Sequence, residues 1–206
     1  RKITPGGTSS TIAGRGDSLG YSGDGGSARN ALIGSSSGLA VDSEGNVFTA
    51  ERDTHRIRKI SVDGLISTIA GNGQAVDSGD GGQSLEAGLD TPGGLQTSPD
   101  GGLVVTTRTR IRAISPSGQI STIVGDGTPG SPADGGAIET SRVSSPTFPV
   151  YDSRGRLYFV NDSRQVFRLD SDGRLHHVAG RRDGAAILNF GADARESSFG
   201  RITALS

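Results

Sequence analysis

Three aspartates recur in the same short loop of this sequence, and each of them is followed by two glycines. They are Asp24, Asp80 and Asp134, which lie 56 and 54 residues apart. Carboxylates on glycine-rich loops are ligands for Ca²⁺, which takes six to eight oxygen atoms. Each loop offers one or two acidic groups and few neighbours to complete such a shell. We therefore favour a turn held by the aspartate side chain, predict no metal, and keep the loops as candidates for partner binding.

A second candidate surface consists of short polar turns that follow apolar runs. Its members are Glu51, Arg52, His55 and Arg56 in one stretch, Arg108 and Arg110 in the next, and Asn161, Asp162 and Arg164 in a third. Arginines in equivalent places suit an acidic partner or a polyanion. Ion pairing with nearby acidic residues such as Glu51 or Asp53 is the structural alternative. We favour ion pairing over RNA binding, because the chain has 21 basic and 22 acidic residues and no aromatic residues between these arginines.

One of these turns contains a modification motif. Asn161-Asp-Ser163 is an N-glycosylation acceptor sequence. We expect it in a turn between two strands, where it would be accessible. If a eukaryote secretes the protein, Asn161 is the predicted glycosylation site.

No motif in the chain predicts a catalytic residue or a cofactor. Gly34–Gly38 has the letters of a G-x-S-x-G nucleophile elbow, but a strand follows it instead of a helix. Gly125–Gly130 matches G-x-G-x-x-G, yet it continues into proline and glycine and not into the helix of a dinucleotide site. The chain has no cysteine, and His176 and His177 are adjacent in a predicted strand, so they point to opposite faces.

The candidate residues belong to a repeated unit. Similar segments end in glycine at positions 14, 71, 125 and 180, which are 57, 54 and 55 residues apart. Within one unit, apolar or β-branched runs at 39–41, 47–50, 56–60 and 65–70 are separated by turns of Asp, Ser and Gly. Four short antiparallel strands in each repeat predict a β-propeller or a stack of small sheets.

Residues 39–51, LAVDSEGNVFTAE, and 55–60, HRIRKI, resemble the NHL repeat, whose blade reads GVAVD-x-x-GN-(V/I)-Y-(V/I)-AD and then NHRI-(R/K)-K. The resemblance implies an all-β propeller of four-stranded antiparallel blades. We predict one domain, 1–206, made of a partial blade 1–14, blades 15–71, 72–125 and 126–180, and a partial blade 181–206 with a strand at Ile202–Leu205. This arc of about four blades would belong to a six-bladed ring, and a closed four-bladed ring is the alternative. The family's Asn-His-Arg, here Thr54-His55-Arg56, is lost in the other two units.

The fold implied by the resemblance favours a non-enzymatic scaffold that presents its loops to a protein or glycan partner, in an extracellular or cell-surface assembly. Relatives of the fold also include metal-dependent lyases and lactonases, and RNA-binding modules. A metal in the central channel needs His, Asp or Glu on the inner strands, which here offer Asp42, Ser98 and Asp152 and no histidine. No apolar run approaches a membrane span of about 18 residues. The chain begins with Arg1, so we expect a longer chain that supplies the rest of the propeller.

Overall fold

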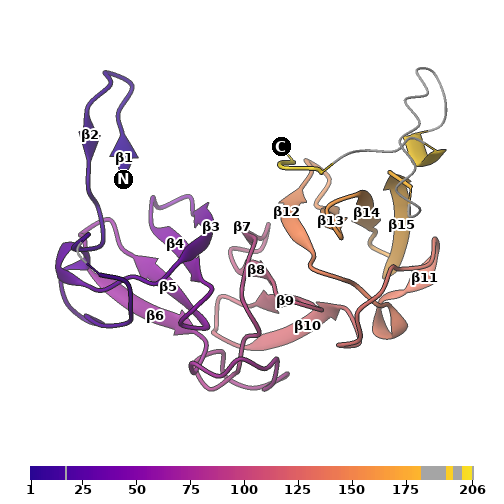
Figure 1. The fold of residues 1–206 in the computed structure, drawn as a ribbon, viewed down its shortest axis with the longest axis horizontal. Coiled ribbons are helices and arrows are strands. Elements are labelled where there is room, and N and C mark those ends of the chain that lie inside the picture. The colour runs from indigo at the N-terminus through magenta and orange to yellow at the C-terminus, as the bar shows by residue number, and fades with distance from the viewer. Residues whose placement is uncertain (17, 182–193, 197–200, 206) are drawn as a thin grey trace.

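The computed structural model describes residues 1–16, 18–181, 194–196 and 201–205, and these form three antiparallel sheets in a row. Figure 1 shows the sheets side by side in an open arc, with a two-stranded hairpin standing at the N-terminal end. The hairpin and the first blade are β1 (Lys2–Ile3), β2 (Ser9–Ser10), β3 (Ser36–Val41), β4 (Val47–Glu51), β5 (Arg56–Ile60) and β6 (Ile66–Ala70). The second blade is β7 (Leu95–Thr97), β8 (Leu103–Thr106), β9 (Ile111–Ile114) and β10 (Ile120–Val124). The third is β12 (Thr147–Tyr151), β13 (Leu157–Asn161), β14 (Gln165–Leu169) and β15 (Arg174–Ala179), with β11 (Gly136–Ala137) added at its outer edge. Short 3₁₀ turns cover Ala28–Asn30, Ile138–Thr140 and Ala194–Glu196.

Each blade is a simple meander because short turns with their own hydrogen bonds join its strands. Between β3 and β4, the carboxylate of Asp42 accepts the backbone N–H groups of Glu44 at 3.1 Å and Asn46 at 2.8 Å. Asp152 does the same between β12 and β13, where it accepts from Arg154 and Arg156. These side chains satisfy turn N–H groups that no strand partner reaches, so they fix the register of each hairpin.

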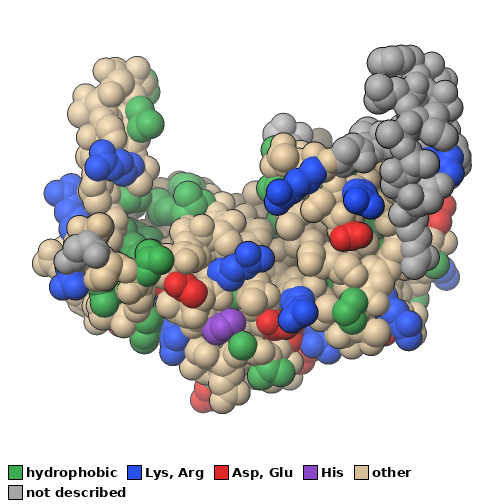
Figure 2. Space-filling model, viewed as in Figure 1, with side chains coloured by type: hydrophobic (Ala, Val, Ile, Leu, Met, Phe, Trp, Pro, Cys, Tyr) green, Lys and Arg blue, Asp and Glu red, His purple; other side chains and the backbone are tan. Residues whose placement is uncertain are grey.

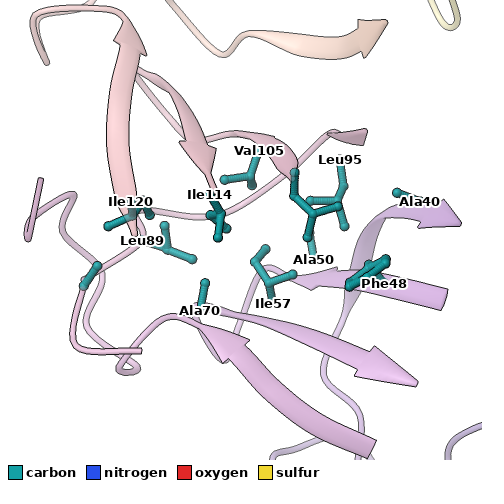
Figure 3. Close-up of a cluster of buried hydrophobic side chains, with 12 residues drawn as sticks. Ala40, Phe48, Ala50, Ile57, Ala70, Leu89, Leu95, Val105, Ile114 and Ile120 are labelled. Carbon is teal, nitrogen blue, oxygen red and sulfur yellow. The ribbon is translucent and has the colours of Figure 1, made fainter. Parts of the chain in front are cut away.

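The apolar core lies between the blades. Alternate residues of a strand face opposite sides, so each blade buries one set of side chains against each neighbour. Figure 3 shows the interface of the first and second blades, where Phe48 and Ile57 meet Leu95, Val105 and Ile114. A second cluster fills the next interface and contains Val104, Ile111, Val124, Val143, Leu157, Phe159, Phe167 and Leu175.

The blades approach one another closely at their first strands, since β3 contacts β7 and β7 contacts β12. A Cβ atom on Gly38 of β3 would overlap the carbonyl oxygen of Gly93. Only glycine fits at this position, because any side chain would push the two strands apart. Gly94 occupies the equivalent position of the second blade, whereas the third blade has Phe148, with φ of 52°.

Each long linker runs along the outer edge of the blade that follows it. In the second blade, Gly81 N–H donates to Ile120 O at 2.7 Å, and Ser84 N–H donates to Gly118 O at 2.8 Å. In the third blade the linker forms strand β11 on β15. The linkers cover otherwise unpaired strand edges, and their buried residues, such as Leu89, fill the wedge between blades.

The predicted all-β fold of four-stranded antiparallel blades is confirmed, and three full blades follow the predicted two-stranded N-terminal segment. The strand predicted at Ile202–Leu205 is wrong, because these residues form none, although Ile202 N–H donates to Ser163 O at 2.8 Å. The rest of the predicted partial blade 181–206 lies largely outside the described residues. Within the described ranges, no helix is long and apolar enough to cross a membrane.

Candidate binding surface

The three predicted polar turns lie at equivalent ends of the three blades, and we call this surface the turn edge (residues 51–56, 107–110 and 161–165). An equivalent backbone hydrogen bond ties each turn to the linker before its blade. The donors are the N–H groups of Arg52, Arg108 and Asp162, and the acceptors are the carbonyls of Ser35, Asp90 and Ser144, at 3.0, 3.0 and 2.9 Å. The same local geometry is therefore built three times along the arc.

His55 connects the first turn to the second blade. Its Nδ1 lies 3.1 Å from Leu89 O and 3.3 Å from Thr91 N. Depending on the tautomer, this nitrogen donates to the carbonyl or accepts the N–H. Both partners belong to the linker of the second blade, so the His55 side chain holds two blades together.

Arg56 and Arg110 hold the linkers that leave their own blades. Arg56 Nη2 donates to Asn72 O at 3.2 Å, and Arg110 Nη2 donates to Asp126 O at 3.1 Å. The Arg56 guanidinium also lies 3.9 Å from the ring centroid of Tyr21. These two arginines are half-buried in internal contacts, which leaves them little freedom to bind a partner.

Arg52, Arg108 and Arg164 project from the turn edge and are exposed. The part of the chain that the structure describes offers their guanidinium groups no hydrogen bond or ion pair. Figure 2 shows basic side chains, in blue, over all three blades on one face of the arc. Three unpaired cations on equivalent turns can contact an acidic surface without first breaking internal bonds.

The loop aspartates of the first two repeats pair with buried arginines, and we call these contacts the linker clasps (Asp24–Arg58 and Asp80–Arg112). Asp24 Oδ1 lies 2.7 Å from Arg58 Nη2, and Asp80 Oδ1 lies 2.6 Å from Arg112 Nη2. The arginine side chains are 0% and 1% exposed. Each clasp joins a linker to the third strand of the blade that it precedes.

Each buried arginine has a second, buried carboxylate, which comes from a different element in the two blades. In the first blade, Glu51 at the end of β4 lies 3.6 Å from Arg58. In the second blade, Asp77 of the linker lies 3.7 Å from Arg112 and accepts the Thr107 hydroxyl at 2.6 Å. The negative charge is kept although its position in the sequence changes, which indicates that the buried arginine requires it.

The clasp aspartates stay ionised. Partial burial raises the pKa of Asp24 and Asp80, but the hydroxyls of Thr68 and Thr122 and the arginine charges outweigh it and hold each pKa below its ordinary value. Burial raises the pKa of Glu51. Because the aspartate pKa values are lowered, the clasps stabilise the fold at neutral pH and weaken as pH falls through those lowered values.

Sequence comparisons agree with this architecture. A family model described as the Teneurin NHL domain matches residues 16–78. Teneurin-1 of Gallus gallus is 32% identical in an alignment of 165 residues that covers 69% of this chain. The chain belongs to the NHL-repeat family of β-propellers. It covers 6% of the length of that Teneurin-1.

Solved structures share the NHL-type fold at low sequence identity. A protein of unknown function from Bacteroides thetaiotaomicron superposes with a TM-score of 0.63 and 19% identity, over 82% of this chain and 41% of that one. An auxiliary nutrient binding protein from the same organism gives 0.58 and 14% identity, over 80% and 40%. At these identities the likeness concerns the fold alone.

The third NHL blade lacks the linker clasp. Phe167 stands where the other blades have the buried arginine, and it stacks on Phe159 with ring centroids 5.9 Å apart. Asp134 instead accepts the backbone N–H of His177 at 3.0 Å and lies 3.8 Å from His176 Nδ1. The three repeated aspartates therefore do not share one environment.

One group of side chains near Asp134 has the residue types of a metal site. Ligand atoms of Asp170, Asp172 and His176 lie within 4.8 Å of one another. However, Arg168 holds both oxygens of Asp170, at 2.6 Å each. A cation would have to displace this arginine, so the geometry favours the ion pair.

The buried arginines are the main residues that the sequence analysis missed. Neither arginine is among the candidate residues of the sequence analysis, and neither is Asp77. A signal was present, since the two repeats with Gly-Asp-Gly-Gly also have arginine in this position, and the repeat with Ala133-Asp-Gly-Gly has Phe167. This co-occurrence points to a contact between the loop and the strand.

The expected accessibility of Asn161 is wrong. Its side chain is 1% exposed. Its Oδ1 accepts the Ser144 N–H at 2.7 Å, and its Nδ2 donates to Gly130 O at 3.2 Å. A glycan on Nδ2 would displace Gly130 and could not fit in this buried position. The predicted glycosylation therefore conflicts with the folded NHL blade.

Replacing Ser163 with glycine removes the acceptor sequence without touching the Asn161 amide. Ser163 has φ of 58°, which glycine adopts readily, so the fold should be kept. After expression through a eukaryotic secretory pathway, we expect the mass of the chain to change only by the serine-to-glycine difference. Loss of a glycan mass on Ser163→Gly, measured by intact-protein mass spectrometry, would contradict the burial argument.

Proposed function

We propose that this NHL arc is a non-enzymatic interaction module that binds an acidic protein partner through its turn edge. The observation that carries the proposal is the row formed by Arg52, Arg108 and Arg164. These side chains are exposed and without partners among the described residues, whereas the neighbouring Arg56 and Arg110 are engaged. Unpaired cations on a surface attract and orient an anionic partner.

The turn edge has the rigidity that such a surface needs. Each exposed arginine lies in a turn between two paired strands, and backbone hydrogen bonds from Arg52, Arg108 and Asp162 tie the three turns to the linkers. Ser145 N–H also donates to Arg108 O at 2.8 Å and joins the second turn to the third blade. Loops on a rigid scaffold lose little entropy on binding.

The similarity to Teneurin-1 supports an interaction role in an extracellular or cell-surface setting, and it also supports a longer chain that supplies the other blades. A glycan with acidic groups would satisfy the same cations. We favour a protein because an acidic protein surface can reach arginines on three blades at once.

The carboxylates that a central metal enzyme would use are engaged within their own turns. Asp42 accepts two backbone N–H groups, and its second oxygen accepts from Asn46 at 2.7 Å. For Asp152, the backbone N–H of Arg156 is the main cause that lowers its pKa to about 2. Arg156 also pairs with Asp152 at 2.6 Å. These contacts support a scaffold role over the lyase or lactonase alternative.

The test compares the chain with a variant in which Arg52, Arg108 and Arg164 are all replaced by serine. Each chain is immobilised and exposed to detergent-solubilised surface proteins of the source organism, with and without ribonuclease. We expect the triple variant to capture at least about tenfold less protein than the unmodified chain, and the difference should be larger at low salt. A matched control replaces the exposed Lys2, Arg29 and Arg154 by serine, which removes the same charge, and should capture normally.

Two outcomes would overturn the proposal. Equal loss in both triple variants would show that only net charge matters. Capture that disappears after ribonuclease treatment would show that the turn edge binds RNA and not an acidic protein.

A further inference from the structure

A groove opens between the second and third blades. It lies at the strand ends opposite those that carry the turn edge. It encloses about 450 Å³ and lies between the turns around Ser98 and Ser115 and the third-blade strand β12. Val104, Ile120 and Ile123 form apolar walls, and Val104 and Ile120 are fully buried. We call it the second groove.

Asp100 lies at the mouth of the second groove without a counter-ion. Its Oδ1 accepts the Ser98 hydroxyl and the Gly102 N–H, and these two bonds, the hydroxyl first, hold its pKa below the ordinary value. No Lys or Arg of the described residues pairs with it. None of the described residues donates a hydrogen bond to its second oxygen, Oδ2. The groove therefore has a fixed negative charge with one free acceptor.

Tyr151 forms another part of the lining. It is half-buried, and within the ranges that the structure describes its hydroxyl has no hydrogen-bond partner. Burial, and then the charge of Asp100, raise the pKa of the phenol. Tyr151 therefore stays neutral at physiological pH and offers both a ring face and a hydroxyl.

The equivalent groove between the first and second blades has a different chemistry. It encloses about 580 Å³ and is lined by Lys59, whose Nζ lies 5.7 Å from the ring centroid of Phe48. The repeat places Ala113 in the second groove where the first has Lys59. The first groove thus has its own cation over its aromatic ring, and the second groove has an aromatic ring and a carboxylate without one.

We propose that the second groove binds an arginine side chain of a peptide segment in a partner protein. The guanidinium would lie on the Tyr151 ring and donate to Asp100 Oδ2, with its aliphatic part against Ile123. Arginine fits better than lysine because its planar group can stack on a ring and donate to a carboxylate at the same time. This site is independent of the turn edge, which has the opposite charge.

The test uses a blocked tripeptide with a central arginine, titrated into the ¹⁵N-labelled chain and followed by the amide shifts of Gly81 and Ser121 and the ring protons of Tyr151. The same tripeptide with citrulline removes the charge and keeps the shape. We expect the citrulline peptide and the Asp100→Asn variant each to weaken binding about tenfold. Asparagine keeps the Oδ1 acceptor of the turn, so Asp100→Asn should fold normally. Tyr151→Leu should weaken binding about threefold.

Asp172→Asn is the matched control, since Asp172 also caps its own hairpin turn and does not line the second groove. It should bind the arginine peptide as the wild type does. Butylamine, a small molecule with the same positive charge, tests whether that charge alone accounts for binding. The proposal is overturned if the citrulline peptide binds equally, if Asp100→Asn has no effect, if Asp172→Asn weakens binding as much, or if butylamine binds as tightly as the peptide.

Discussion

Replacing Gly71 with alanine should lower the free energy of unfolding by about 3–5 kcal/mol. Gly71 closes the first blade with φ of 93°, a conformation that alanine adopts only at a cost. A Cβ atom there would also overlap the His55 carbonyl oxygen and lie 2.8 Å from Arg56 Cα. Both obstacles are backbone at the start of β5, which is paired along its length with β4 and cannot shift freely.

Gly14→Ala is the matched control for this effect. Gly14 holds the same position in the preceding repeat, with φ of 86°, but the nearest atom to its added Cβ is Ile33 Cδ1 at 3.6 Å. Its substitution should cost about 1 kcal/mol, the conformational part alone. Urea denaturation followed by circular dichroism measures both variants. Similar losses for Gly14→Ala and Gly71→Ala would show that the backbone contact contributes nothing.

Arg112→Leu should destabilise the chain by about 3–5 kcal/mol, because it leaves the buried carboxylate of Asp77 with only Arg110, at 4.0 Å, as a counter-charge. Asp77 is 3% exposed and lies 3.7 Å from the guanidinium. The carbonyls of Ser78 and Gly88 also lose their donor, at 3.0 and 3.2 Å. Leucine fills part of the volume but replaces none of these hydrogen bonds.

A double variant separates the charge from the packing. Adding Asp77→Asn to Arg112→Leu removes the buried charge and should recover part of the loss, on the order of 1–2 kcal/mol. Asp80→Asn is the control, since the Asp80 side chain is 52% exposed and its ion pair should contribute at most about 1 kcal/mol. If the double variant were no more stable than Arg112→Leu in urea denaturation, the buried charge would not be the cause.

Much of the fold follows from local chemistry in the sequence. The strand predicted at residues 56–60 has these bounds in the structure, because turn residues mark its limits and a β-branched pattern fills it. The same holds for residues 47–50, where the strand extends by one residue to Glu51. Repetition strengthened each of these assignments, since several landmarks recurred with nearly equal spacing.

The features that sequence reasoning missed depend on contacts between segments far apart in the chain. Arg58 and Arg112 look like surface residues because charged residues are rarely buried, and only the wedge filled by the linker makes their burial feasible. Asn161 lies at a strand end beside an exposed turn, yet the linker at Gly130 and Ser144 covers it. Local periodicity contains no information on such coverage.

The sequence predicted the candidate binding residues only in part, because contacts with the linkers decide which of them are exposed. The repeat correctly indicated that the turns around Arg52, Arg108 and Arg164 are equivalent, because spacing alone places them at matching strand ends. It could not separate these exposed arginines from Arg56 and Arg110, which contact the linkers. That difference arises from the path of the linkers, which no single-blade pattern encodes.

The path of the linkers also bears on how the chain is made. The residues that cover the outer edge of a blade and close over its buried arginine precede that blade in the sequence, as Asp80 precedes Arg112. During synthesis on a ribosome, the linker has therefore already emerged when the last strand of its blade leaves the exit tunnel. Each blade can complete its own edge in order of translation, so a nascent chain exposes at most one unfinished edge at a time.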